Sequence, residues 1–217
     1  MLRRIRVGLV VLAAVLGAAT AAVAKQGDDA SNRFAGAIYA FAADTPIPSV
    51  LASVSPTVGI IGLGYEMTGG WGGSPHWGWN GSFGYGIGGV KEKQSDPTGS
   101  VTDELKVSHW EVRLGLDYWG DCCDQTWYCG PGLVYMSTGG TIQSTGSPDF
   151  DLEPIKTFGL DARAGGQLHL GRKARLFGAM SILAGRSTWD QTDSGTTLEE
   201  TAWVTTYSYR GGLRWSF

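Results

Sequence analysis

Eight charged side chains are the groups of this sequence best placed to do chemistry, because each lies between apolar or small neighbours. Four are acids and four are arginines: Glu66, Glu111, Asp117, Asp161, Arg113, Arg163, Arg210 and Arg214. Charges removed from water must pair, since an isolated buried charge costs several kcal/mol. Eight such groups in one interior predict either a charge-balanced plug or the lining of a narrow pore. We favour the plug.

Three histidines offer general-base chemistry, and Ser108 directly precedes His109. Neighbouring residues of a strand point to opposite faces, so these two side chains cannot form a nucleophile–base pair without a bulge. His76 and His169 have no serine two residues further on. The sequence therefore predicts no catalytic residues and no cofactor.

Three cysteines, Cys122, Cys123 and Cys129, lie within eight residues of one another. In an oxidising compartment one of the first two can pair with Cys129 and leave an odd thiol. Zinc is the alternative, but no histidine is close in sequence and the spacing fits no familiar motif. Acids in the polar links could instead gather divalent cations, although a solvated rim is the simpler interpretation. These acids are Asp149, Asp151, Glu153, Asp190, Asp193, Glu199 and Glu200.

The composition favours a β-rich chain with an apolar outer face. Gly occurs 34 times and Trp nine times, while only 17% of the 217 residues are charged. Soluble domains usually carry about 25% charged residues. The length suits one domain. A soluble β-sandwich could share this composition, so the assignment depends on the patterning.

Residues 1–24 read as a signal peptide. Arg3, Arg4 and Arg6 precede an apolar run over 7–16, and small residues end the segment at 22–24. An uncleaved anchor is the alternative. Without these three arginines, 14 basic residues face 20 acidic ones, a net charge of 14 − 20 = −6. This charge excludes a basic face for nucleic acid.

Alternation of apolar and polar residues organises the rest of the chain. Residues 203–217 carry aromatic and apolar side chains at every second position, and the segments around residues 82, 114 and 164 repeat the pattern. Aromatic residues recur eight positions apart on the apolar face, which is about 20 Å along the axis of a tilted strand. Such spacing predicts two aromatic girdles at bilayer depth. Their members are Trp77, Tyr85, Trp110, Tyr118, Tyr207 and Trp215.

Eight strand segments result, and we expect an all-β, eight-stranded antiparallel up-and-down transmembrane β-barrel over residues 33–217. Residues 25–32 form a polar leader. The facing of strands 1, 5 and 7, around residues 33–42, 127–137 and 174–188, stays open because both parities are apolar. Long polar links are expected over 43–56, 90–103, 138–154 and 189–198, and shorter ones over 68–75, 120–126 and 171–173. Long links outside and short turns inside would place both termini in the periplasm.

The chain resembles the small eight-stranded outer-membrane barrels, such as OmpX and the membrane domain of OmpA. The resemblance is architectural, and its most specific element is the last strand. Tyr209, Gly211, Leu213, Trp215 and Phe217 resemble the terminal signal that the barrel-assembly machinery reads. It implies a monomer in the bacterial outer membrane, in contact with lipopolysaccharide.

The resulting functional hypothesis is a non-enzymatic barrel with a structural or surface-interaction role through its outer loops. A narrow channel is the first alternative. A lipopolysaccharide-modifying enzyme is the second, because two small barrels, a palmitoyltransferase and a deacylase, act on that lipid. The sequence names no ligand.

Overall fold

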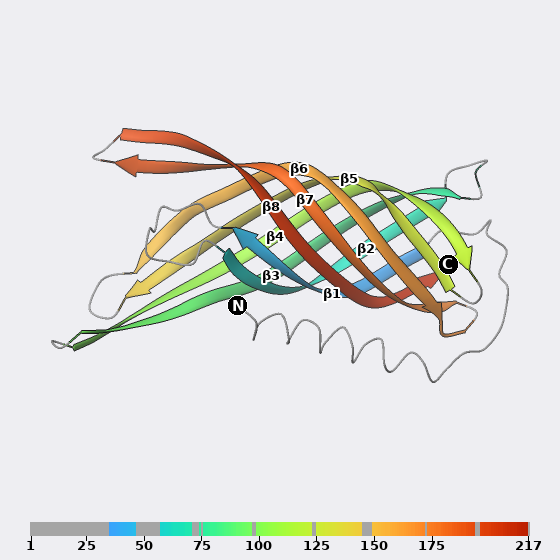
Figure 1. Cartoon of the computed structure of the whole chain (residues 1–217), viewed down its shortest axis with the longest axis horizontal. Coiled ribbons are helices and arrows are strands. Elements are labelled where there is room, and N and C mark those ends of the chain that lie inside the picture. Colours follow the sequence, from blue (N-terminus) through green and yellow to red (C-terminus); the bar gives the residue numbers. More distant parts are fainter. Residues whose placement is uncertain are drawn as a thin grey trace.

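A closed ring of antiparallel strands makes up the structure (Figure 1). The computed structural model describes residues 35–46, 57–70, 74, 76–96, 99–122, 125–144, 149–171, 173–193 and 196–216. The strands are β1 (Ala35–Pro46), β2 (Thr57–Gly70), β3 (Trp77–Asp96), β4 (Gly99–Cys122), β5 (Gln125–Ser144), β6 (Phe150–His169), β7 (Ala174–Asp193) and β8 (Thr196–Ser216). The predicted signal peptide and polar leader lie outside the described residues.

Every strand pairs with its neighbours in sequence, and the first strand pairs with the last. The β1–β8 seam runs from the pair Ala35 and Ser216 to the pair Asp44 and Tyr207. This pairing removes the two free edges that an open sheet would expose. The predicted all-β, eight-stranded, up-and-down topology is confirmed. No helix within the described ranges is long and apolar enough to cross a membrane.

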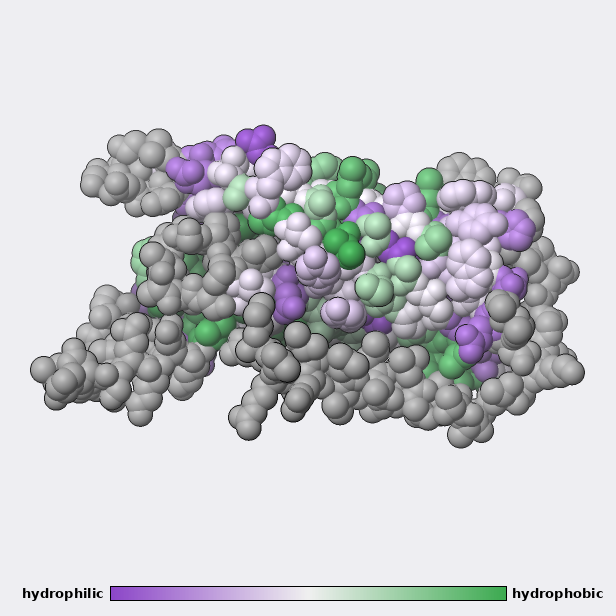
Figure 2. All heavy atoms as spheres, viewed as in Figure 1, coloured by the Kyte–Doolittle hydropathy of each residue, from purple (hydrophilic) through white to green (hydrophobic). Residues whose placement is uncertain are grey.

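Side chains alternate strictly between an apolar outer wall and a buried interior. On β4, Val112 and Leu114 are exposed while Glu111 and Arg113 are buried. On β8, Tyr209 and Leu213 are exposed while Arg210 is buried. Figure 2 shows hydrophobic residues across the middle of the barrel wall and a hydrophilic patch along the β7–β8 hairpin at the upper left. The predicted parity is confirmed on β2, β3, β4, β6 and β8.

The three strands with unassigned facing turn large apolar side chains inward. Tyr39 and Phe41 of β1 are buried, as are Tyr128 of β5 and Phe177 of β7. Their outward neighbours are apolar as well, which explains why the sequence pattern could not choose a face. An eight-stranded barrel has an interior just wide enough for side chains, so rings of this size need small residues opposite them.

Three of the predicted long links are wrong, because most of each consists of strand. β3 and β4 continue to Asp96 and Gly99, and the β5–β6 and β7–β8 hairpins reach Ser144 and Asp193 before they turn. Strands β4 and β5 likewise extend into the predicted turn over 120–126. Outside a membrane both faces of a hairpin meet water, so the alternation disappears although the backbone ladder persists. The polar residues of these hairpin extensions were therefore misread as loops.

Glycine 64 shows how tightly the interior is filled. A Cβ atom built at Gly64 would collide with the ring of Tyr39 and lie 2.6 Å from the carbonyl oxygen of Phe83. At Gly166, which lies on the outer wall, the nearest atom is 3.8 Å away. Substitutions at both positions remove the backbone flexibility of glycine, but only the one at Gly64 would overpack the interior.

We predict that Gly64→Val lowers the free energy of unfolding by about 1–3 kcal/mol through overpacking. Gly166→Val should change it far less. Urea unfolding of the barrel in detergent micelles, followed by tryptophan fluorescence, measures both. Equal effects of the two substitutions would show that the interior is not close-packed around Tyr39.

Candidate functional site

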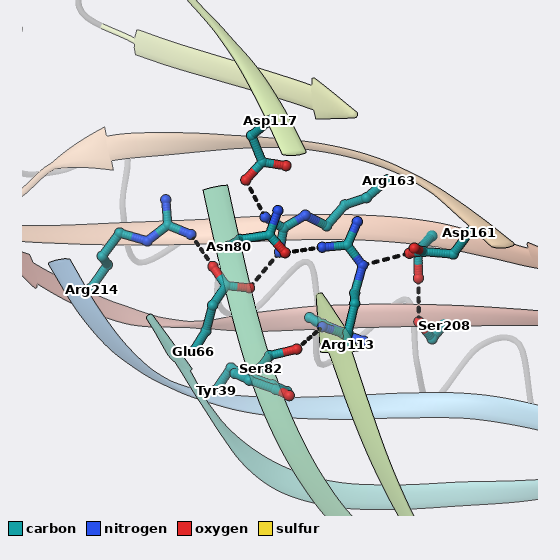
Figure 3. A network of polar contacts seen from close by, with 12 residues as sticks. Tyr39, Glu66, Asn80, Ser82, Arg113, Asp117, Asp161, Arg163, Ser208 and Arg214 are labelled. Atoms are coloured by element: carbon teal, nitrogen blue, oxygen red, sulfur yellow. Dashed lines mark hydrogen bonds and ion pairs between the residues drawn. The ribbon is translucent and has the colours of Figure 1, made fainter. Parts of the chain in front are cut away.

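All eight predicted charged residues lie inside the barrel, and all are buried. They come from four strands: β2 supplies one, β4 three, β6 two and β8 two. Because inward positions recur every second residue, these four alternate strands of the ring deliver their charges to the same stretch of the interior. Figure 3 shows these side chains converging from opposite walls. The equal number of acids and arginines leaves the set neutral.

A continuous chain of ion pairs crosses the end of the interior nearer the short turns. Arg163 binds the carboxylates of both Glu66 and Asp117. Glu66 uses its other oxygen to bind Arg214. The guanidinium of Arg214 also donates a hydrogen bond to Gln167 Oε1 at 3.0 Å. Each carboxylate is therefore neutralised by a fixed cation from another strand.

Two further pairs fill the middle of the barrel. Arg113 Nε donates to Asp161 Oδ2 at 2.7 Å, and the same guanidinium donates to the side-chain oxygen of Asn80. Arg210 donates to Glu111 Oε1 at 2.7 Å. Such charge-assisted bonds are the strongest hydrogen bonds available to side chains. Together with the first chain they span the interior from wall to wall.

Aromatic rings pack against the arginines, and sequence reasoning did not find them. The Arg163 guanidinium carbon lies 5.0 Å from the ring centroid of Tyr128, and that of Arg210 lies 5.2 Å from Tyr39. Arg214 lies 4.8 Å from the centroid of Phe177. Cation–π contacts of this kind gain strength when the cation is desolvated. The glycines of β2 and β3 could have indicated these rings, because glycine leaves space for a large side chain on the opposite wall.

The interior closes toward the hairpin end. His109 lies there, with Nδ1 2.9 Å from the hydroxyl of Thr138 and Nε2 3.9 Å from Glu111. A small cavity of about 10 Å³ beside it has room for roughly one water molecule. Above it the inner wall is apolar, with Val58, Ile60, Leu105, Val107 and Ile155 in one buried cluster. Among the described residues, this end therefore includes an apolar section above the cavity.

Metal binding and catalysis were the alternatives that the sequence left open. In the described part of the chain no three His, Cys, Asp or Glu side chains come together as metal ligands. Ser108 is exposed on the outer wall while His109 is buried, so the two diverge as expected. The side chain of Asp193 lies outside the described residues, and Asp149 and Asp151 accept hydrogen bonds from Gln143 and Thr141.

The predicted disulfide is wrong for Cys129, which is a free and exposed thiol. The ladder between β4 and β5 places Cys122 opposite Gln125 and Cys129 opposite Tyr118. Four residues of extended strand separate the two positions by about 13 Å, far beyond disulfide reach. The strands continue almost to the turn and hold the cysteines at different levels. Cys123 lies outside the described residues.

The predicted girdle residues lie on the outer wall in two groups. Trp77 faces Tyr118 across β3 and β4, and Tyr85 faces Trp110 eight residues further on. Trp77 and Tyr118 pack edge to face with centroids 5.3 Å apart. Tyr207 is exposed and Trp215 half-buried, and the latter packs beside Tyr65 at 6.4 Å. In the last strand, Tyr209 and Leu213 face outward, Gly211 shares their parity, and Phe217 lies outside the described residues.

The chain was compared with known proteins. No protein-family model matches it, and no curated protein matches it in sequence. Solved structures do match in fold. The outer membrane protein OprG of Pseudomonas aeruginosa is 14% identical, with 88% of this chain and 99% of that chain covered and a TM-score of 0.52.

Two further matches have lower TM-scores. The outer membrane protein AlkL, solved in lipid bilayers, is 14% identical over 90% of this chain and 95% of its own, with a TM-score of 0.49. Ail, the attachment invasion locus protein of Yersinia pestis, is 12% identical over 85% of this chain and 99% of its own, with a TM-score of 0.43.

The fold and the apolar outer wall define the class of this protein. It is a small eight-stranded β-barrel of the bacterial outer-membrane type, like OprG in architecture. Its outer wall carries a band of exposed apolar residues framed by aromatic side chains, which is the surface that an outer membrane requires. The bacterial outer membrane is the location for which this surface is built.

We predict that Arg163→Met destabilises the barrel by about 3–5 kcal/mol, because it leaves two buried carboxylates without their shared cation. Adding Asp117→Asn should recover part of the loss by removing one of those charges. Lys173→Met, at the exposed turn between β6 and β7, is the control and should be neutral within about 0.5 kcal/mol. Urea titration of the refolded variants measures all three. A neutral Arg163→Met would mean that the network is not what fills the interior.

Proposed function

We propose that the protein is an exported, monomeric and non-enzymatic outer-membrane barrel that acts through its long β-hairpins on the cell surface. One observation carries the proposal: the interior is filled by a neutral ion-pair network, whereas three hairpins project from one end of the ring. The surfaces left for interaction with other molecules are then the projecting hairpins and the outer wall. The leader at residues 1–24 would direct export.

The β3–β4 hairpin is the longest of these projections. Tyr85 and Trp110 mark one edge of the apolar wall, and the ladder continues from there to the pair Asp96 and Gly99. Eleven further residues of extended strand span about 36 Å along the hairpin. Figure 1 shows this hairpin projecting furthest at the lower left, apart from the β7–β8 hairpin at the upper left. Separated hairpins of this length offer several independent surfaces for recognition.

The contacts of the interior argue against the channel alternative. Arg163, Glu66 and Arg214 form linked ion pairs across the lumen, and the apolar cluster at Val58 and Ile60 lies toward the other end. An ion would have to displace paired charges and then cross an apolar section. Catalysis is equally disfavoured, because the buried His109 lies beside a cavity with space for about one water molecule.

We predict that the purified protein shows no stable conductance in planar lipid bilayers. The paired interior leaves no continuous water path, so traces should stay at the baseline at moderate voltage. The double substitution Arg163→Ala with Arg214→Ala leaves the apolar cluster at Val58 and Ile60 in place, so its traces should stay at the baseline as well. Steady conductance of the unaltered protein would overturn the plug and favour the channel.

We also predict that the hairpin end faces the outside of the cell. A short epitope inserted between Asp96 and Gly99, at the β3–β4 turn, should be detected by antibody on intact cells. The same epitope inserted between Gly171 and Lys173, at the β6–β7 turn, should be detected only after the outer membrane is permeabilised. The reverse pattern would place the hairpins in the periplasm and remove the basis of the proposed role.

A further inference from the structure

Two cations and two aromatic residues meet on the outer wall where the hairpins leave the ring. Phe158 of β6 is the ladder partner of Arg186 on β7, and Arg186 is the partner of Trp203 on β8. Lys156 lies two residues above Phe158 on the same face and is therefore the diagonal neighbour of Arg186. Diagonal neighbours of this kind lie about 7–8 Å apart at the backbone. Both long side chains can thus reach one ligand.

These four side chains are open to their surroundings. Trp203 is 82% exposed and Phe158 is 57% exposed, and both cations are exposed as well. Arg186 donates one hydrogen bond, to the hydroxyl of Thr201 at 3.2 Å, which holds the guanidinium against β8. Among the described residues neither Arg186 nor Lys156 forms an ion pair with a carboxylate. Both charges remain available.

The position of this group matches one edge of a bilayer. On β7 the outward residues run from Leu176 through Met180 and Ile182 to Arg186, ten residues along. At the tilt of such barrels this corresponds to about 25 Å along the axis, which is the height of the apolar band. Arg186 and Lys156 therefore lie at the border between hydrocarbon and headgroups, on the side of the hairpins.

The cations also mark one side of the barrel. Lys106 of β4 lies four residues further toward the hairpin tip along the ladder, and its ammonium group donates to Gln143 at 2.6 Å. On β1, which β8 separates from β7, the exposed charged residue at the hairpin end is an acid, Asp44. An anion at the membrane border would thus be attracted to the wall of β6 and β7 and repelled from β1.

We propose that Lys156 and Arg186, framed by Phe158 and Trp203, bind a phosphate group of the lipid A part of lipopolysaccharide. Arginine and lysine are the residues that bind phosphate oxygens, and a guanidinium can donate two parallel hydrogen bonds to them. The aromatic neighbours suit the region where headgroups meet acyl chains. Below Phe158 the outward residues of β6 are Leu160, Ala162 and Ala164, which are all apolar, so acyl chains can lie against this part of the wall.

Binding to a lipid rather than to a dissolved anion follows from the level of the site. The two cations adjoin the apolar wall instead of a polar pocket, so a ligand must bring an apolar part to cover Phe158 and Trp203. A phosphorylated lipid provides both parts in one molecule. The site rests on the proposed orientation, because lipopolysaccharide occupies the outer leaflet.

The test measures binding of purified lipid A to the detergent-solubilised protein by native mass spectrometry, in buffer with a chelator to remove divalent bridges. The probes are bisphosphorylated lipid A, its fully dephosphorylated form, phosphatidylglycerol and inorganic phosphate. We expect the unaltered protein to retain bisphosphorylated lipid A in preference to the other three. Lys156→Gln with Arg186→Gln should weaken this binding about 25-fold, about fivefold for each cation removed.

Lys173→Gln removes an exposed cation at the opposite end and serves as the matched control, with unchanged binding expected. An unchanged affinity of the double variant would overturn the site. Equal retention of phosphatidylglycerol would reduce it to a general anionic-lipid surface, and equal retention of inorganic phosphate would contradict a lipid ligand. Binding in micelles does not depend on which end of the barrel faces outward. A negative result in the lipid A binding test can therefore be distinguished from a negative result in the epitope or conductance experiments.

Discussion

A backbone that crosses hydrocarbon has no water to satisfy its N–H and C=O groups, and the structure depends on meeting that requirement within the chain. In this protein the β1–β8 seam completes the ladder, so each strand has two partners. Closure at eight strands then fixes the width of the interior. The alternation of side chains follows, because one face of every strand meets lipid and the other meets its opposite wall.

A narrow interior must be filled, and here large polar groups fill it. The four arginines span the lumen, and each is held by carboxylates, amides or rings from other strands. On β2, β4, β6 and β8 the buried charges also distinguish the inner face of the strand from the apolar outer face. The price is that breaking a single pair exposes a buried charge. We propose that such an interior leaves recognition to the hairpins and to the membrane border.

The sequence predicted the features that alternation encodes. Glu111 and Arg113 on β4, and Arg210 and Arg214 on β8, were assigned to the interior because their neighbours are apolar at every second position, and they are buried there. The pairing between strands could not be read in the same way. Which acid meets Arg163 depends on register and on the curvature of the ring, and neither is visible in one strand.

Other features were missed for physical reasons. The facing of Tyr39 and Phe177 was left unassigned because an aromatic ring can pack either against lipid or against an arginine in the interior. The hairpin extensions were taken for loops because they leave the membrane, where alternation loses its cause, and Cys129 was consequently paired with the wrong level of the ladder. The cations at Lys156 and Arg186 were not recognised as a pair, because their proximity arises only from the register between β6 and β7.

Closure of the ring at the observed β1–β8 register is the central claim, and a cross-strand disulfide tests it directly. Ala40 of β1 and Gly211 of β8 are ladder partners on the outer wall. In a variant without the three native cysteines, cysteines at these two positions should oxidise almost completely in the folded protein. Cysteines at Ala40 and Tyr207, four residues out of register, should remain reduced. Oxidation of the second pair instead of the first, or of neither, would contradict the closed barrel described here.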